Sequence, residues 1–447
     1  MAFGPERLAA ALAAMEPDWP SSGFCVALSG GLDSTVLLHL MVRLRAGNGR
    51  LRLRAVHVDH GLQPGSPAWA QACAQFCRSI DVRLRTVRLG LVPAPGESVE
   101  AEARRARYAA IAGILEPGEW LLTAHHRDDQ METVLIQLLR GAGVAGLAAM
   151  PSRAHLGPGW HGRPLLDVDR AALADYARQA GLSWVADPMN SATRYDRGWL
   201  RERVLPAVRE RWPGASATVA RSASHLAEAA GLLAGLAESD AAGLLDGGRL
   251  SIAGLQHLPR ERRVNLLRWW IRQQGLGPPP TTQLASVLDS LVAARVDGEP
   301  VVRWSAGELR RYRGRLYAMR PLAEPPSGPW RLELASASGL ELGPGLGRFS
   351  LVATRQGGLG APPAGEIELR FRAGGETLRP HPARPRKRLK QLCQEAGIVP
   401  WMRPRLPLVF VGSRLAAVGD LWIDAELAVA PGLPALAPLW SGRPELF

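Results

Sequence analysis

The segment Ser29-Gly30-Gly31-Leu32-Asp33-Ser34 has the composition of an anion-binding loop. Glycines let the backbone approach a phosphate closely, and a helix that begins here offers unpaired N–H groups and the positive end of its dipole. Ser29 and Ser34 add hydroxyl donors, and the Gly-Lys-Ser/Thr of the common P-loop is absent. The carboxylate of Asp33 would repel phosphate unless a divalent cation lay between them. Asp33 is therefore a candidate magnesium ligand, and a glycine-rich turn without a ligand is the alternative.

Titratable side chains follow a predicted strand at Trp120 to Ala124. His125 stands at the end of this strand, where it could donate to a phosphate or carry a proton; a purely structural histidine is the alternative. Asp129 and Glu132 are three residues apart on the first turn of a predicted helix, where the dipole stabilises carboxylates. Plain capping of that helix, with Asp128 in the cap position, is the other interpretation.

Arginines supply the positive charge that nucleotidyl transfer needs more than covalent help. Arg104 and Arg107 are three residues apart on one predicted helix and share a face, which could equally be a solvated surface. Arg197 lies further along the chain and can steady a phosphate or a carboxylate. His57, near the end of another predicted strand, either lines an adenine site or packs in the core.

Strands and helices alternate over about the first 212 residues. The predicted strands are Phe24–Leu28, Leu53–Val58, Val82–Leu89 and Trp120–Ala124, and the predicted helices include Leu8–Met15, Thr35–Arg45, Val99–Leu115 and Asp129–Leu139. This alternation predicts an α/β domain with a parallel sheet covered on both faces. Ligands of such folds lie at the carboxyl ends of the strands, where the candidate residues stand.

The alternation of predicted strands and helices ends near residue 212. Helical periodicity over 216–238, 260–274 and 281–294 predicts a mainly helical unit, followed by a hairpin over Val301–Met319 with its turn at Arg313-Gly314. A small α+β unit begins near Ile367 and includes a basic helix at Arg386–Glu395 and strands at Leu408–Val411 and Leu415–Val418. We therefore expect domains at 1–214, 215–322 and 366–447, with 323–365 as a connection rich in Pro and Gly.

A basic run in the last unit has no acidic residue between Arg379 and Lys390. Its candidate phosphate-binding residues are Arg384, Arg386, Lys387, Arg388 and Lys390. Lys387 and Lys390 are the only lysines of the chain. A solvated charged surface is the alternative interpretation.

Composition narrows the class of protein. The chain has 447 residues and a formal net charge of +13, which favours a polyanionic partner. Hydrophobic residues make up 47% of the chain, and no apolar run approaches the roughly 20 residues needed to cross a bilayer. The four cysteines form no Cys-x-x-Cys pair, which argues against zinc, an iron–sulfur cluster and a disulfide framework. We expect a cytoplasmic protein without membrane association.

Further motifs occur in order along the chain: Val56–Leu62, Glu100–Tyr108, His125–Thr133, Asp187–Asn190 and Tyr195–Arg201. With the loop at Ser29–Ser34, they resemble the tRNA(Ile)-lysidine synthase family of the ATP pyrophosphatase (PP-loop) superfamily. Near the other end, Leu369–Arg379, Arg386–Lys390, Val399–Trp401 and Pro407–Val409 follow the terminal domain of that family. Asp59 and Gly198 depart from it, because the family usually has Asn at both positions.

The resemblance implies an adenine nucleotide α-hydrolase-like (PP-loop ATPase) domain followed by two tRNA-binding domains. It implies that ATP, with Mg²⁺, adenylates the wobble cytidine of the CAU anticodon of isoleucine tRNA. Free L-lysine then displaces AMP and gives lysidine. A monomer or homodimer without an obligate protein partner is expected.

The residue types and the resemblance together give a set of candidate site residues. The catalytic set is Asp33, His125, Asp129, Glu132 and Arg197, of which Asp129, Glu132 and Arg197 would bind lysine. The ATP-binding set is Ser29, Gly30, Gly31, Leu32, Asp33, Ser34, His57, Arg104 and Arg107.

Three other classes of protein are alternatives. A tRNA cytidine thiolase of the same superfamily usually needs cysteines at Cys-x-x-Cys spacing, which this chain lacks. A non-catalytic tRNA-binding protein would have no reason to retain the loop together with Asp33, Asp129 and Glu132. A small-molecule synthetase would not need the basic terminal unit.

Overall fold

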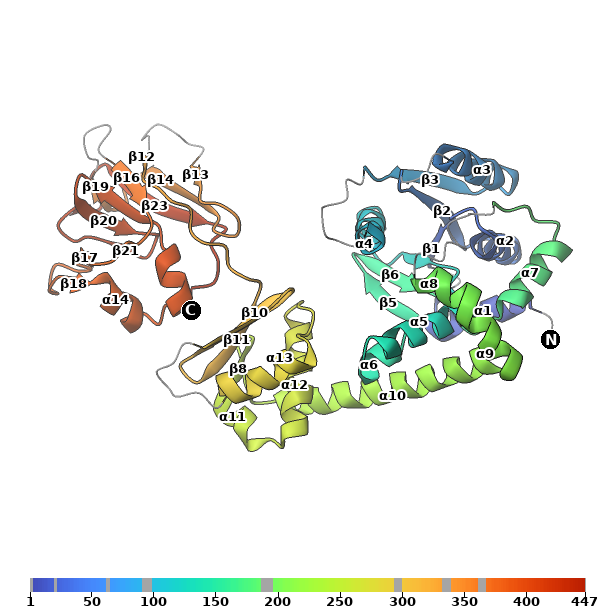
Figure 1. Cartoon of the computed structure of the whole chain (residues 1–447). Helices are drawn as coiled ribbons and strands as arrows, with labels where there is room; N and C mark the ends of the chain where they lie inside the picture. Colours follow the sequence, from blue (N-terminus) through green and yellow to red (C-terminus); the bar gives the residue numbers. More distant parts are fainter. Residues whose placement is uncertain are drawn as a thin grey trace. The chain divides into compact units, whose positions relative to one another are not determined.

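The computed structural model describes residues 3–19, 22–61, 65–90, 99–185, 196–292, 300–331, 339–360 and 367–446, without the side chains of 99–101 and 289. Two compact units are present, Met1–Leu233 and Ala234–Phe447 (Figure 1). The motif at Asp187–Asn190 and residue Tyr195 lie outside the described residues.

The first unit is built on a six-stranded sheet in the order β3-β2-β1-β4-β6-β5. The strands are β1 (Gly23–Ala27), β2 (Arg52–Asp59), β3 (Arg83–Arg88), β4 (Trp120–Leu122), β5 (Arg153–Leu156) and β6 (Gly159–Gly162). All neighbours are parallel except β5, which runs antiparallel to β6. The predicted parallel α/β fold is confirmed, and β5 and β6 extend it beyond the four predicted strands.

Helices cover both faces of this sheet (Figure 1). They are α1 (Pro5–Met15), α2 (Leu32–Gly47), α3 (Ser66–Ser79), α4 (Val99–Ala112), α5 (Arg127–Leu139), α6 (Val144–Leu147), α7 (Arg170–Gln179), α8 (Asp196–Trp199), a π-helix (Leu200–Val204) and α9 (Leu205–Arg211). Because side chains alternate along a strand, Phe24 and Val26 of β1 pack in one core with α1, α2 and α7. Cys25 packs in another core with Ile111 of α4.

The order of the strands fixes where a ligand can bind. The chain leaves β1 for β2 on one side of it, and returns to β4 on the other side. Folds of this kind bind ligands in a crevice at the carboxyl ends of the strands beside such a reversal, which are β1 and β4 in this sheet. The loops after β1 and β4 carry the Ser29–Ser34 and His125–Glu132 motifs, so the fold brings these two motifs together.

The middle of the chain combines helices with a sheet. Helices α10 (Ala215–Ala241), α11 (Ile252–His257), α12 (Arg260–Gln273) and α13 (Thr281–Ser286), with a π-helix (Val287–Val292), bear out its helical character. The sheet β7-β8-β11-β10-β9 was not predicted as such. Its strands are β7 (Leu245–Asp246), β8 (Arg249–Ser251), β9 (Val301–Trp304), β10 (Gly307–Tyr312) and β11 (Arg315–Met319). The turn at Arg313-Gly314 is confirmed, since both residues have positive φ, but Val301–Met319 forms three strands and not one hairpin.

The last part of the chain is rich in β-structure. One sheet has the order β12-β16-β19-β20-β21 and another β13-β14-β23-β15-β22. The strands are β12 (Trp330–Arg331), β13 (Leu340–Glu341), β14 (Arg348–Thr354), β15 (Gly358–Gly360), β16 (Ile367–Arg370), β19 (Leu408–Val411), β20 (Arg414–Val418), β21 (Trp422–Ile423), β22 (Ala428–Val429) and β23 (Ala435–Ser441). The described part of 323–365 therefore contributes four strands to these sheets and is more than a connection.

The basic helix predicted over Arg386–Glu395 is shorter in the structure. Helix α14 spans Leu389–Glu395, while Lys387–Arg388 forms the strand β18, which pairs with β17 (Thr377–Leu378). Lys387 and Arg388 are extended because they pair with β17. Pro385 in addition disfavours the helical conformation at the residue before it. No helix in the described parts of the chain is long and apolar enough to cross a membrane.

Candidate active site

Hydrogen bonds within the loop after β1 and the first turn of α2 fix the conformation of this loop. The Ser29 N–H donates to Ser34 Oγ at 3.2 Å, and the hydroxyls of Ser34 and Thr35 both donate to the Gly31 carbonyl. Gly30 has a φ of +84°, and a Cβ there would lie 3.0 Å from Cys73 Sγ. Glycine is therefore required at position 30. Leu32 begins α2, so the N-terminus of this helix faces the crevice as predicted for a phosphate site.

Asp33 lies on the first turn of α2, beside the end of β4. Its Oδ2 lies 3.7 Å from Nε2 of His126. Burial raises the pKa of Asp33, and the charges of His126 and Arg170 oppose that effect. Its Oδ1 is buried and has no hydrogen-bond partner among the described residues. A buried, unpartnered carboxylate oxygen at an anion-binding loop fits a magnesium ligand, although no cluster of three metal-binding side chains occurs among the described residues.

His126, and not Asp128, caps helix α5. The His126 N–H donates to Asp129 Oδ2 at 2.9 Å, with Asp129 at the third helical position. Asp128 instead forms an ion pair with Arg209 at 2.9 Å. The capping interpretation therefore holds for Asp129, which also lies 3.5 Å from His126 Nε2. His126 lies between the carboxylates of Asp33 and Asp129. The residue types in the sequence predicted His125 as the site histidine and did not indicate His126.

Asp129 keeps its negative charge in this site. Burial acts to raise its pKa, but His126, His125 and the His126 backbone N–H together outweigh burial and lower the pKa. A carboxylate with a lowered pKa is a good binder of cations and a poor acceptor of protons at neutral pH. The prediction that Asp129 holds an amine as an ammonium ion is consistent with this environment.

Both carboxylate oxygens of Glu132 accept hydrogen bonds from the side chain of Arg201. Arg201 donates from Nε and Nη2 to its two oxygens at 2.8 and 2.9 Å, and the Glu132 side chain is 1% exposed. Arg201 Nη2 also lies 3.6 Å from Asp129. Direct lysine binding by Glu132 would require this buried ion pair to open. Arg201, which lies in the π-helix one turn after Arg197, was missed.

Two of the predicted arginines, Arg104 and Arg197, lie close enough to His125 for their charges to act on it. Arg197 donates from Nη2 to Thr133 Oγ1 at 3.3 Å. The guanidinium of Arg104 lies over the ring of Tyr108, 5.2 Å from its centre. Both cations act to lower the pKa of His125, although burial is the larger cause. Arg107 acts instead on His60, whose pKa is lowered by burial and then by Arg107.

His125 is neutral at physiological pH. Its pKa is lowered to about 3, first by burial and then by Arg163, Arg104 and Arg197 against the opposing charge of Asp129. A histidine with so low a pKa does not act as a base near neutrality. The role of proton carrier is therefore disfavoured, while the role of hydrogen-bond donor remains.

His57 supports the loop from within the core. It is 6% exposed, and its Nδ1 lies 2.8 Å from the carbonyl oxygen of Leu28. Because a carbonyl only accepts, His57 donates and fixes the residue that precedes the loop. Of the two interpretations of His57, the structure favours packing over direct adenine contact.

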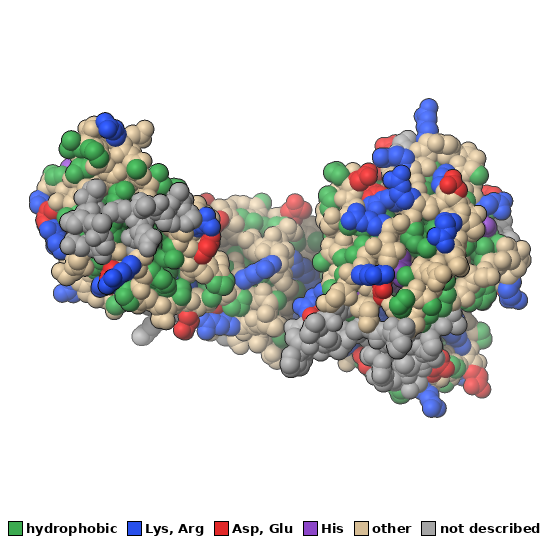
Figure 2. Space-filling view, turned by 90° about the horizontal axis from the view of Figure 1, so that it is seen from above, with side chains coloured by type: hydrophobic (Ala, Val, Ile, Leu, Met, Phe, Trp, Pro, Cys, Tyr) green, Lys and Arg blue, Asp and Glu red, His purple; other side chains and the backbone are tan. Residues whose placement is uncertain are grey.

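The basic run near the end of the chain divides into two groups. Arg386 forms ion pairs with Asp424 at 3.0 Å and Glu426 at 3.2 Å, and Lys387 bonds both oxygens of Glu395. Arg384, Arg388 and Lys390 are exposed. Several arginines also lie on the face of the first unit displayed in Figure 2, where a nucleic acid could bind them.

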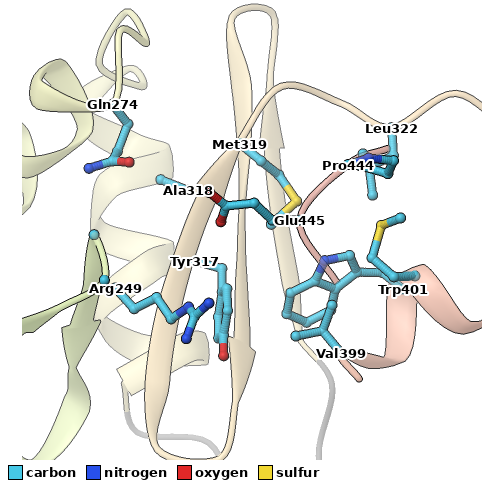
Figure 3. Close-up of a pocket in the computed structure, with 13 residues that line it drawn as sticks. Arg249, Gln274, Tyr317, Ala318, Met319, Leu322, Val399, Trp401, Pro444 and Glu445 are labelled. Atoms are coloured by element: carbon cyan, nitrogen blue, oxygen red, sulfur yellow. The ribbon is translucent and has the colours of Figure 1, made fainter. Parts of the chain in front are cut away.

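A separate cavity of about 250 Å³ lies within the second unit (Figure 3). In it the guanidinium of Arg249 lies over the ring of Tyr317, 5.3 Å from its centre, and Trp401 meets Tyr317 edge-on at 5.0 Å. None of the predicted site residues lines this cavity. Most of the catalytic candidates lie instead on the segments that follow β1 and β4, and Arg197 contacts Thr133 of α5.

A parallel sheet whose switch point carries a Ser-Gly-Gly-Leu-Asp-Ser loop and a facing His-Asp-Glu motif defines an ATP-using enzyme of the PP-loop class. Family models agree: that of the PP-loop domain matches residues 6–208, that of the TilS substrate binding domain 250–317, and that of the TilS substrate C-terminal domain 367–439. The chain belongs to the tRNA(Ile)-lysidine synthase family, as its sequence resemblance indicated.

Curated relatives match along almost the whole chain. The tRNA(Ile)-lysidine synthase of Methylococcus capsulatus is 41% identical over 94% of this chain and 97% of that protein. Those of Alkalilimnicola ehrlichii and Pseudomonas aeruginosa are each 42% identical, over 96% and 92% of this chain and the same shares of the relatives. Among solved structures, the U34-tRNA thiolase NcsA of Methanococcus maripaludis matches 50% of this chain and 77% of its own, with 17% identity and a TM-score of 0.43.

Proposed function

We propose that this protein uses ATP to ligate free L-lysine to the wobble cytidine of the CAU anticodon of isoleucine tRNA, releasing AMP and pyrophosphate. The observation that carries the proposal is the match of about 40% identity, from one end of the chain to the other, with tRNA(Ile)-lysidine synthases. The site residues agree with it, because arginines and carboxylates lie together near the N-terminus of α2.

In the first step, the ring carbonyl oxygen of the cytosine attacks the α-phosphorus of ATP, and the bond to pyrophosphate breaks. The loop N–H groups at Ser29–Ser34 and the N-terminus of α2 bind the phosphates. Arg104 and Arg197 neutralise the charge that develops on them. Asp33 would hold Mg²⁺, which supplies further charge neutralisation when bound.

In the second step, the ε-amine of lysine attacks the activated ring carbon and AMP leaves. A free lysine amine has a pKa of about 10.4, so it arrives as an ammonium ion. It must lose one proton to solvent water before the neutral amine can attack, and the attacking nitrogen loses a second proton to water as AMP leaves with the electron pair of the broken carbon–oxygen bond. Asp129, with its lowered pKa, binds this cation. Arg197 binds the lysine carboxylate, and Glu132 contributes by holding Arg201 beside Asp129.

A thiolase mechanism is disfavoured by the state of the cysteines. Cys73 lies beside the loop, but burial raises its pKa to about 12. A thiol with this pKa stays protonated and is a poor nucleophile. Cys25, Cys77 and Cys393 are likewise buried, and each is a free cysteine whose pKa burial raises. Free thiols agree with a cytoplasmic location, which is part of the proposal, as is a monomer or homodimer.

The test is a reconstituted reaction with the purified full chain. ATP, radiolabelled lysine and a transcript of isoleucine tRNA with a CAU anticodon should give labelled tRNA, with pyrophosphate released in equal amount. Methionine tRNA, which has the same anticodon, is the matched RNA control. Incorporation of sulfur in place of lysine, or tRNA binding without pyrophosphate release, would contradict the proposal.

A further inference from the structure

Four side chains form a hydrogen-bonded series that ends at His125. Thr123 Oγ1 lies 2.8 Å from His125 Nδ1 and 2.8 Å from His161 Nε2. His161 Nδ1 lies 3.0 Å from Arg163 Nη2. Thr123, His161 and Arg163 are all buried, with exposed fractions of 9%, 4% and 8%. Water therefore does not compete for these hydrogen bonds.

The chemistry of the groups fixes the direction of every hydrogen bond. A guanidinium only donates, so Nδ1 of His161 must accept from Arg163. The neutral His161 then carries its proton on Nε2 and donates to Thr123 Oγ1. The single hydroxyl hydrogen of Thr123 is left to donate to Nδ1 of His125. His125 therefore carries its own proton on Nε2, which no hydrogen bond engages among the described residues.

The pairing of two strands and an anchoring hydrogen bond fix the positions of the side chains in this series. Strand β6 pairs with β4, so that His161 lies opposite Leu121, and the Thr123 N–H donates to the Gly162 carbonyl at 3.0 Å. A Cβ on Gly162 would lie 2.8 Å from Leu122, so glycine is what permits this approach. Arg163 is anchored from its other side, where Nη1 donates to the Pro151 carbonyl at 2.7 Å.

We propose that Thr123, His161 and Arg163 are positioning residues that fix His125 as a neutral imidazole with its proton on Nε2. His125 then offers the bound nucleotide a hydrogen-bond donor and cannot serve as a base. During AMP transfer His125 keeps its proton: the electron pair of the breaking phosphorus–oxygen bond leaves with pyrophosphate, whose charge the N–H stabilises. This role rests on the proposed function, while the tautomer itself does not.

The tautomer can be read by ¹⁵N NMR of histidine-labelled full chain at pH 7, without substrates. The chain has ten histidines, and a His125→Gln variant assigns the signal. The expected spectrum of the unmodified protein shows His125 protonated at Nε2 alone. Thr123→Val removes the hydroxyl and should give a mixture of tautomers, whereas Thr123→Ser should keep the Nε2–H form. A His125 protonated at Nδ1, or unchanged by Thr123→Val, would overturn the proposal.

The consequence for the reaction is measured by pyrophosphate release. Thr123→Val should lower kcat by about tenfold, equal to the removal of one oriented hydrogen bond, with the KM for ATP changed by less than about threefold. Thr123→Ser should restore most of kcat. Thr354→Val, whose hydroxyl accepts from the Gln356 N–H outside the site, is the matched control. If the tautomer is as stated but no variant or parent protein releases pyrophosphate, the proposed function fails and the assignment of the tautomer stands.

Discussion

Arg201 donates two hydrogen bonds, of 2.8 and 2.9 Å, to the carboxylate of Glu132, and Glu132 is the more deeply buried of the two side chains. Burial raises the pKa of Glu132, and the Arg201 charge opposes that effect. The ion pair thus favours the charged form of Glu132 against the effect of burial. It also keeps the guanidinium 3.6 Å from Asp129, the carboxylate that we propose binds the amine of lysine.

A double-mutant cycle tests the coupling of this pair. Arg201→Gln leaves the buried Glu132 carboxyl group without its cationic partner, so the free energy of unfolding should fall by about 3–5 kcal/mol. Glu132→Gln keeps hydrogen-bonding capacity and should cost less, about 1–3 kcal/mol. The double variant should recover part of the sum, with a coupling of about 1–3 kcal/mol. Urea denaturation measures all three.

The exposed pair of Arg178 and Asp175 on α7 is the matched control, since both side chains are more than half exposed. Its coupling should stay below about 1 kcal/mol. Both site variants should also raise the KM for lysine while leaving ATP binding intact. Additive losses of stability, or a loss of ATP binding with normal lysine dependence, would show that Glu132 and Arg201 do not act together on the lysine side.

Asp33→Asn tests the metal ligand separately from folding. Because burial raises the pKa of Asp33, removing its charge should leave the free energy of unfolding unchanged or higher. Pyrophosphate release should nevertheless fall by about 100-fold or more, a loss typical of removing one charged transition-state partner. Asp18→Asn, at an exposed position outside the crevice, is the control. Release by Asp33→Asn at the parental rate, over a magnesium titration, would remove Asp33 from the reaction.

The first unit could be predicted well because its signals are local. Buried strands that end in glycine, and helices with apolar residues at regular spacing, gave the parallel sheet and the placement of its loops. The switch point between β1 and β4 then brings Asp33 to His126 although they are far apart in the sequence. Arg201 and the Thr123–His161–Arg163 series were missed, since partners of this kind are set by packing between elements that sequence spacing does not reveal.

The β-structure in the last part was harder for a different reason. Strand β14 pairs with β23 along its whole length, from Arg348 opposite Ser441 to Thr354 opposite Ala435. Such a pairing is specified by residues far apart in the sequence, and the Pro and Gly around β14 indicated only a loop. A truncation at residue 366, which the sequence alone recommends, would remove β23 and leave β14 without its main partner.

The basic run can be tested with two sets of charge-neutral variants. Arg384→Gln, Arg388→Gln and Lys390→Gln remove exposed cations. Together they should reduce the log–log salt slope of tRNA binding by about 0.7–0.9 for each phosphate that these cations neutralise. Arg386→Gln and Lys387→Gln, whose partners are carboxylates of the same unit, should change the slope less. An equal change of the salt slope in both sets would mean that tRNA opens the internal ion pairs. An unchanged salt slope in both sets would mean that this surface is only solvated.

His161 makes the stability of the protein depend on pH. Burial, aided by Arg163, lowers its pKa to about 3 from an ordinary value near 6.5. Between these two values the unfolded chain binds a proton that the folded chain does not, so stability is complete above about pH 6.5 and falls as pH decreases. From pH 7 to pH 4.5, His161 should account for a loss of up to about 2–3 kcal/mol. His161→Phe removes this contribution, while the same-signed contribution of His125 remains.

Urea denaturation at several pH values between 4.5 and 7.5 measures the effect as a difference in slope, so any change that Phe makes to packing at pH 7 cancels. The unfolding free energy of His161→Phe should fall less steeply toward pH 4.5 than that of the parent protein. His225→Phe, at an exposed position on α10, should follow the parent curve. Parallel curves for His161→Phe and the parent would show that His161 can take up a proton in the folded state. The hydrogen bond from His161 to Thr123 would remain in that case, but Nδ1 of His161 would carry a proton and could not accept from Arg163.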